Sequence, residues 1–118
     1  MSKYKYLDDR RIRALADAAI VAGNSGIRST FQFSVFLNCA RMEGHCVADI
    51  FNVSSDTAEY KRYYTSLRQL MLGAANRGRN GVDLLMWGEN VYRLERAVLL
   101  TPKGLRLYKE IKSLLELT

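Results

Sequence analysis

Residues 82–104 read VDLLMWGENVYRLERAVLLTPKG, and this stretch decides the expected fold. Two runs rich in strand-forming residues, 82–87 and 91–101, flank the short segment 88–90, which contains a glycine. Such runs joined by a short glycine-containing loop predict a β-hairpin. The rest of the chain lacks a strand pattern of this strength, so we expect one two-stranded hairpin in an otherwise helical protein.

The hairpin leads into a helix whose start is well marked. Pro102 suits the first helical position, and Thr101 suits the N-cap before it. An apolar stripe at helical spacing follows, formed by Leu107, Tyr108, Ile111, Leu114 and Leu115. We expect this stripe to pack on the chain's own core or on the first helix of a second copy.

Four helical segments are predicted before the hairpin from the spacing of apolar residues. Serine and threonine residues that suit N-caps precede the second and the fourth of them. The segments are 6–22, a helix from Ser29 or Thr30 to about 41–44, a short one within 46–53, and a long one from Ser54 or Ser55 to 72–75. A basic turn containing Arg77 and Arg79 then precedes the hairpin.

This order predicts the fold class α+β, mostly α. A short helix, a turn, a longer helix and a hairpin form a winged helix-turn-helix with a two-stranded β-hairpin wing and flanking N- and C-terminal helices. The 118 residues suit a single domain. Within it we assign 1–28 to the N-terminal helix, 29–101 to the winged helix and 102–118 to the C-terminal helix.

The composition points to a polyanionic partner. The net charge is +6 and the sequence pI is about 9.5, and a basic excess on a small domain favours nucleic acid, although it also serves solubility. The only histidine is His45, and the cysteines are Cys39 and Cys46, which are too few for a zinc site. We therefore expect no metal, no cofactor and two buried reduced thiols.

The chain carries no motif that predicts an enzyme. It has no phosphate-binding glycine loop and no HExxH sequence. His45 directly follows Gly44, which suits a turn better than an active site. The sequence also lacks an apolar run of about 18 residues and a secretory signal at its start. We expect a cytoplasmic protein without enzymatic activity.

The segment from about Phe33 to Ile111 resembles the MarR-type winged-helix regulators. The likeness lies in 47–53 as the first helix of the helix-turn-helix, in 54–71 as the recognition helix, and in the passage from the wing into the last helix. That passage carries Val98, Leu100, Thr101 and Gly104. Where the family commonly has an aspartate and an arginine in the wing, this chain has Tyr92 and Leu94, with Arg93 and Arg96 nearby.

The resemblance implies a sequence-specific regulator that binds double-stranded DNA as a homodimer. Residues of the fourth helix that avoid its apolar stripe are expected to face the DNA, together with arginines of the turn and the wing. The candidate DNA-binding residues are Ser55, Thr57, Lys61, Arg62, Thr65, Arg68, Arg77, Arg79, Arg93 and Arg96. Tyr60, Tyr63, Tyr64 and Trp87 are expected to pack rather than to stack on bases.

The terminal helices would pair two copies of the chain. The candidate dimerisation residues are Ile12, Leu15, Ile20, Leu107, Tyr108, Ile111, Leu114 and Leu115. Two alternatives stay open, because one fold can serve several functions. The same surface would dock a protein partner in a winged-helix interaction module, or would bind DNA without sequence preference as an architectural protein.

Overall fold

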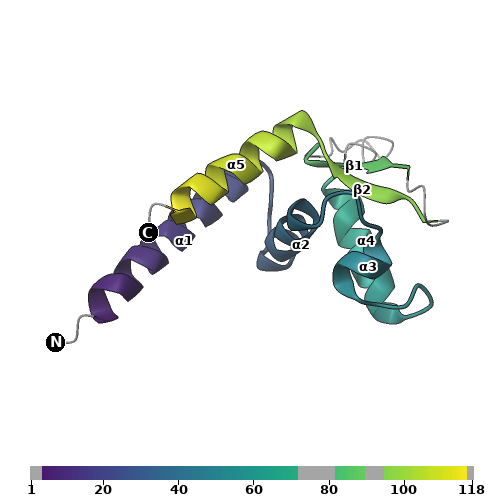
Figure 1. Cartoon of the computed structure of the whole chain (residues 1–118), viewed down its shortest axis with the longest axis horizontal. Coiled ribbons are helices and arrows are strands. Elements are labelled where there is room, and N and C mark those ends of the chain that lie inside the picture. The colour runs from purple at the N-terminus through teal and green to yellow at the C-terminus, as the bar shows by residue number, and fades with distance from the viewer. Residues whose placement is uncertain (1–3, 72–81, 90–94, 117–118) are drawn as a thin grey trace.

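The computed structural model describes residues 4–71, 82–89 and 95–116, with side chains from residue 9 onward. The described chain is mostly helical, with one antiparallel hairpin placed before the C-terminal helix (Figure 1). The elements are α1 (Tyr4–Asn24), α2 (Thr30–Arg41), α3 (Val47–Phe51), α4 (Ala58–Gln69), β1 (Leu85–Gly88), β2 (Ala97–Leu100) and α5 (Pro102–Glu116). This confirms the predicted fold class, and the arrangement is compatible with a winged helix.

Helix α2 lies at the centre of the fold. The Ser29 hydroxyl accepts a hydrogen bond from the Gln32 amide at 3.1 Å, so Ser29 is the N-cap, one of the two residues predicted for it. Val35, Phe36 and Cys39 of α2 are buried among α3, α4, the hairpin and α5. The apolar stripe of α2 therefore forms the middle of the core, around which the other elements pack.

The hairpin is fixed on both sides by backbone hydrogen bonds. Strands β1 and β2 pair antiparallel from Leu85 with Leu100 to Gly88 with Ala97. On the outer side of β2, the Gly44 amide donates to the Val98 carbonyl, and the Val98 amide donates to the His45 carbonyl, each at 2.9 Å. The turn after α2 is thus hydrogen-bonded to the outer edge of β2, and Gly44 of this turn has a positive φ of 95°, which favours glycine.

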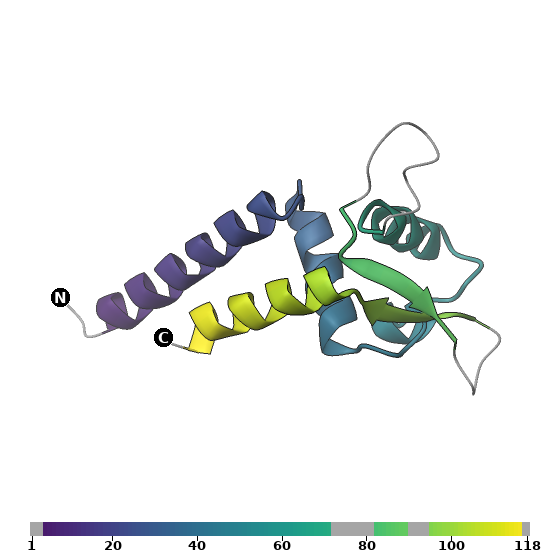
Figure 2. The same cartoon turned by 90° about the horizontal axis from the view of Figure 1, so that it is seen from above.

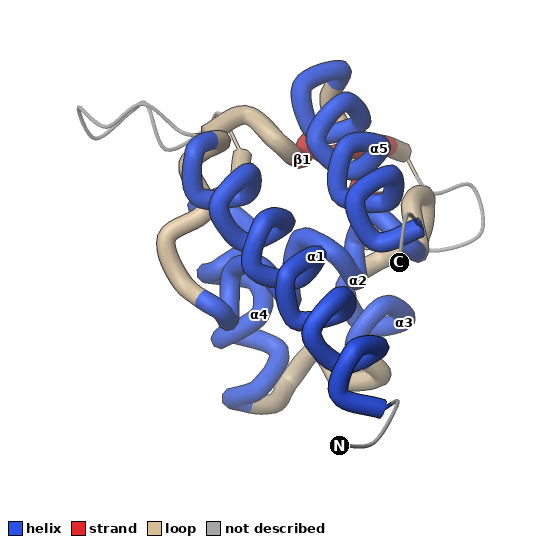
Figure 3. The backbone as a smooth tube through the Cα atoms, turned by 90° about the vertical axis from the view of Figure 1, so that its left-hand side faces the viewer, coloured by secondary structure: helices blue, strands red, loops and turns tan. Residues whose placement is uncertain are grey.

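Helices α1 and α5 form an arm that projects from the rest of the molecule. They run antiparallel and pack along each other, and α1 extends beyond the end of α5 (Figures 2 and 3). The arm makes the molecule elongated, with extents of 54 × 31 × 25 Å. The predicted N-terminal helix is therefore confirmed, and it begins and ends two residues outside the expected range, at Tyr4 and Asn24.

Helix α4 is shorter at both ends than predicted. Its N-cap is Thr57 and not Ser54 or Ser55. The Ser54 carbonyl accepts hydrogen bonds from the Thr57 amide at 3.1 Å and from the Thr57 hydroxyl at 2.7 Å, so residues 54–57 form a turn before the helix. At the other end, the Leu70 carbonyl accepts from the Leu84 and Leu85 amides at 2.9 and 3.1 Å. The helix therefore ends at Gln69, where a contact with the start of the hairpin begins, and the expected end at 72–75 lies outside the described residues.

The hairpin also differs from its prediction. Among the described residues, the pairing ends at Gly88 with Ala97, so Gly88 belongs to β1 and not to the connection in which it was expected. Glu95 and Arg96 lie before β2 and not on it, which corrects the expected start of the second strand at Val91. Residues 91–94 of the predicted strand lie outside the described residues, and Arg96 is exposed and lies over the Trp87 ring.

Candidate nucleic-acid interface

The start of α4 is held by the side chain of Thr57. Its hydroxyl accepts a hydrogen bond from the Tyr60 amide at 3.2 Å, which satisfies one of the free amides of the first turn. The Ser54 hydroxyl donates to Asp56 at 2.7 Å and lowers the pKa of that carboxyl group. Thr57, a predicted DNA contact, is half-buried and uses its hydroxyl within the chain, whereas Ser55 is exposed beside it.

One flank of α4 is exposed and basic. Lys61, Thr65 and Arg68 are four and three residues apart, so their side chains share one face of the helix. All three are exposed, and the Thr65 hydroxyl donates to the Lys61 carbonyl at 2.9 Å. We call Lys61, Thr65 and Arg68 the basic flank.

Arg62 lies on a different side of the same helix. Its guanidinium carbon is 4.2 Å from the centre of the Phe31 ring, a cation–π contact with α2. Nearby, Gln69 accepts a hydrogen bond from the Gln32 side chain at 2.6 Å. Arg62 is exposed, but this contact directs it away from the basic flank with which the sequence had grouped it.

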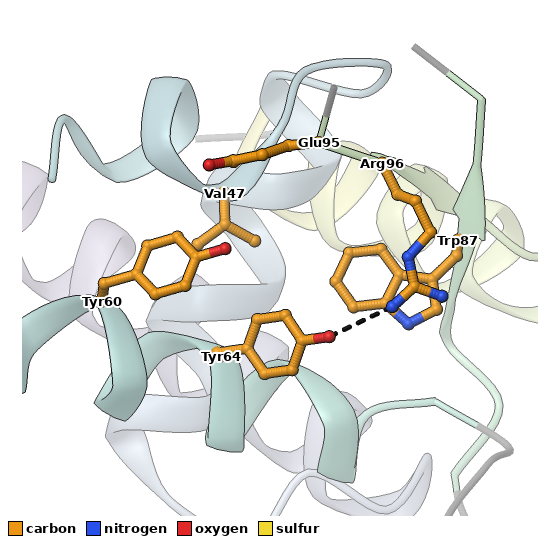
Figure 4. A pocket seen from close by; sticks show the side chains of 6 residues that line it. All are labelled: Val47, Tyr60, Tyr64, Trp87, Glu95 and Arg96. Atoms are coloured by element: carbon orange, nitrogen blue, oxygen red, sulfur yellow. Dashed lines mark hydrogen bonds between the residues drawn. The ribbon is translucent and has the colours of Figure 1, made fainter. Parts of the chain in front are cut away.

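Arg96 approaches the basic flank from the hairpin side. It donates a hydrogen bond to the Tyr64 hydroxyl at 3.1 Å, and its guanidinium carbon lies 4.3 Å from the Trp87 ring centre (Figure 4). Tyr64 belongs to α4, one turn before Arg68. The hydrogen bond therefore connects the segment before β2 to the helix that carries the basic flank.

Three neighbouring hollows share lining residues and together form one surface beside the basic flank. The first lies at the start of α4 and is lined by Ser55, Tyr60, Lys61, Tyr64 and Thr65. The second shares both tyrosines with the first, and Arg96 also lines it. The third shares Trp87 with the second and reaches Arg68. The surface thus runs from Ser55, along α4, to the base of the hairpin.

Three predicted DNA contacts lie outside the described residues, namely Arg77, Arg79 and Arg93. Of the other candidates, Ser55, Lys61, Thr65, Arg68 and Arg96 border the continuous surface, whereas Thr57 caps α4 and Arg62 packs on Phe31. Glu95 also belongs to the surface and was not proposed for it from the sequence. No local pattern in the sequence indicates that Glu95 lines a pocket together with Val47.

The aromatic residues pack, as predicted. Tyr63 stacks between Phe51 and Phe31, with ring centres 4.2 and 5.5 Å away. Tyr64 stacks on Trp87 at 5.4 Å and joins the hairpin to α4. These rings hold α4 against its neighbours and leave its basic flank free to contact a ligand.

The candidate dimerisation residues fall into two groups. Leu107 and Ile111 are buried in the chain's own core, and Tyr108 and Leu114 are half-buried against it. By contrast, four candidates are largely exposed, with fractions of 63% for Ile12, 57% for Leu15, 62% for Ile20 and 41% for Leu115. The stripe of α5 is therefore used mainly inside the chain, whereas α1 presents large apolar side chains to solvent.

The described residues contain two cysteines, but neither a metal-binding cluster nor a membrane-spanning helix. Cys39 and Cys46 are buried free thiols, and burial raises the pKa of Cys39 to about 12 and also raises that of Cys46. Within residues 4–71, 82–89 and 95–116, no group of three histidine, cysteine or acidic residues could hold a metal ion. No helix in this part of the chain has the length and apolar character needed to cross a membrane.

Comparison of the chain with protein-family models, with curated proteins and with solved structures finds no match.

Proposed function

We propose that this protein is a sequence-specific, double-stranded DNA-binding transcriptional regulator of the MarR-like winged-helix type, and that it acts as a homodimer without catalysing a reaction. The observation that carries the proposal is the basic flank of α4 beside Arg96. A helix of this kind enters the major groove, while the hairpin reaches the adjacent backbone. The net charge of +6 adds attraction to DNA.

The geometry suggests separate roles for the candidates. Ser55 and Lys61, near the start of α4, would meet base edges or the first phosphates. Arg68 and Arg96 border the base of the hairpin, where contacts to phosphates would position the domain. Arg62 is a weaker candidate for a base contact than its sequence position implies, because it lies over Phe31.

The experiment is a fluorescence anisotropy titration of duplex DNA over a series of salt concentrations. We expect tight binding at low salt, and Lys61→Ala and Arg68→Ala should each lower the affinity and reduce the salt slope by about one. Lys109→Ala is the matched control, because it removes an equal charge from an exposed position on α5. Its affinity should equal that of the parent.

Titrations of DNA also distinguish the regulator from an architectural DNA-binding protein and from a module that binds a protein partner. Site selection followed by titration of the selected and scrambled duplexes should give a specificity ratio of at least about 10³. Equal affinities would replace the regulator with an architectural DNA-binding protein. An absence of salt-dependent binding at low salt would contradict both DNA-binding proposals and favour a protein partner.

A further inference from the structure

A small pocket lies between α3, α4 and the hairpin. It has a volume of about 190 Å³ and is lined by Val47, Tyr60, Tyr64, Trp87, Glu95 and Arg96 (Figure 4). A cavity of about 150 Å³ suffices to hold benzene. The pocket is therefore large enough for one six-membered ring with a short substituent, and its lining is more polar than that of a core cavity.

The aromatic walls of this pocket suit a cation. The Tyr60 and Tyr64 rings stack with centres 5.9 Å apart, and Trp87 follows Tyr64 at 5.4 Å, so three rings from α4 and β1 form a row. The faces of aromatic rings attract cations. The chain itself uses this property, because the Arg96 guanidinium lies over the outer end of the row, on Trp87.

The pocket wall also carries the carboxylate of Glu95. Glu95 Oε2 is buried and has no hydrogen-bond partner among the described residues. Arg96, the next residue, donates to Tyr64. The Glu95 charge still reaches the pocket wall: burial raises the pKa of Tyr60 most, and Glu95 raises it further. The Glu95 carboxylate is therefore the acidic group of this pocket with which a ligand cation would pair.

We propose that this pocket binds a small organic cation with a primary ammonium group. The ammonium pairs with the Glu95 carboxylate, and the apolar body of the ligand packs on Val47 and against the rings of Tyr60 and Tyr64. Arg96 stays on Trp87 and limits the length of the ligand. Arg96 already donates to Tyr64 and lies over Trp87, whereas the Glu95 carboxylate and the faces of the aromatic rings favour a cation over an anion.

Trp87 provides the signal for a direct test, because it is the only tryptophan in the chain and lines the pocket. The full chain, without DNA, is titrated with benzylammonium chloride at constant ionic strength while tryptophan emission is recorded. Benzoate, which has one aromatic ring and the opposite charge, is titrated in parallel. We expect a saturable change with benzylammonium and a response to benzoate at least tenfold weaker.

Two pairs of variants test the residues named in the proposal. Glu95→Gln should weaken benzylammonium binding at least tenfold, whereas Glu110→Gln, which removes an exposed charge from α5, should leave it unchanged. Tyr60→Leu should weaken binding, and Tyr60→Phe should retain it, because phenylalanine keeps the ring face. Far-ultraviolet circular dichroism verifies that each variant is folded.

Three outcomes would overturn the proposal: no saturable change with benzylammonium, equal responses to benzylammonium and benzoate, or unchanged binding by Glu95→Gln. Since no DNA is present, each outcome is independent of the DNA titration. A protein that does not bind DNA can still bind the cation, and the reverse also holds.

Discussion

Gly104 shows how one residue joins the last helix to the hairpin. The Thr101 hydroxyl accepts from the Gly104 amide at 2.9 Å and donates to the Asp83 carbonyl at 2.6 Å. This brings the first turn of α5 so close to Leu84 that a Cβ on Gly104 would overlap the Leu84 carbonyl oxygen. The glycine is needed for a close backbone approach rather than for an unusual backbone angle.

We therefore expect Gly104→Ala to lower the free energy of unfolding by about 1–3 kcal/mol, the usual range for an overpacked site. Gly23→Ala is the control, because a Cβ at this position of α1 would meet no atom within 4 Å. The control should be neutral or stabilising by up to about 1 kcal/mol. Urea unfolding measures both variants, and equal effects would contradict the close approach.

The thiol of Cys39 makes stability depend on pH in the alkaline range. Burial raises its pKa from 9.0 to about 12. The unfolded chain thus loses this proton above about pH 9 while the folded chain keeps it, so stability falls as pH rises from 9 toward 12. The loss approaches about 1.4 kcal/mol per pH unit for one such group.

Urea unfolding at pH 8 and at pH 10 measures this loss, with Cys39→Ala for comparison. Tyr60 and Cys46, whose pKa values are also raised, contribute in the same direction. The variant is less stable at both values of pH, but its loss between them should be smaller than that of the parent by about 1 kcal/mol. An equal loss in the two proteins would show that Cys39 does not titrate as described.

At the scale of elements, each end of α4 is set by a contact with its surroundings. Thr57 caps the start, and the Leu70 carbonyl leaves the helical pattern to accept from Leu84 and Leu85. The stack of Tyr64 on Trp87 then fixes the rotation of α4 relative to the hairpin. Position, length and rotation together determine that Lys61, Thr65 and Arg68 face solvent.

Thr57→Val should lower the free energy of unfolding by about 1 kcal/mol, because valine has nearly the same shape but cannot accept from the Tyr60 amide. Thr57→Ser should lose much less, since serine is an equally good N-cap. Thermal or urea unfolding distinguishes the two. If Thr57→Val were fully stable and lost only DNA affinity, the residue would be a DNA contact rather than a cap.

At the scale of the whole molecule, helix α1 of the arm buries small side chains and exposes large apolar ones. In α1 the small side chains of Ala14, Ala18 and Ala22 are buried, whereas Ile12, Leu15 and Ile20 are more than half exposed. Alanine is small enough to let α5 approach closely, and the larger residues lie on other faces of α1. Exposed apolar faces of this kind mark interaction surfaces, and a second copy would cover this one by two-fold symmetry.

We expect the protein to be a dimer in sedimentation equilibrium and Ile12→Asn to raise the dissociation constant at least tenfold. Symmetry places two such residues in one interface, and complete burial of each contributes about 1.5–3 kcal/mol. Asp17→Asn, an exposed polar position on the same helix, is the control and should leave association unchanged. A parent that remains monomeric at all concentrations would refute the dimer.

The sequence by itself determined the order and type of the elements. Helical spacing, the Ser29 cap, the Thr101–Pro102 start and the strand-forming runs around Gly88 act within a few residues of one another, and such local signals can be interpreted without the fold. The packing of the tyrosines was predictable for the same reason, because their spacing places them with the apolar stripe of α4.

Only the tertiary structure decided which side chains meet. Arg62 and Lys61 are neighbours in the sequence, yet one packs on Phe31 from α2 and the other borders an exposed groove. Glu95 lines the same pocket as Val47 of α3 and Tyr60 of α4, residues that lie more than 30 positions before it in the chain. Contacts between residues far apart in the chain depend on the packing of whole elements, and no local pattern encodes that packing.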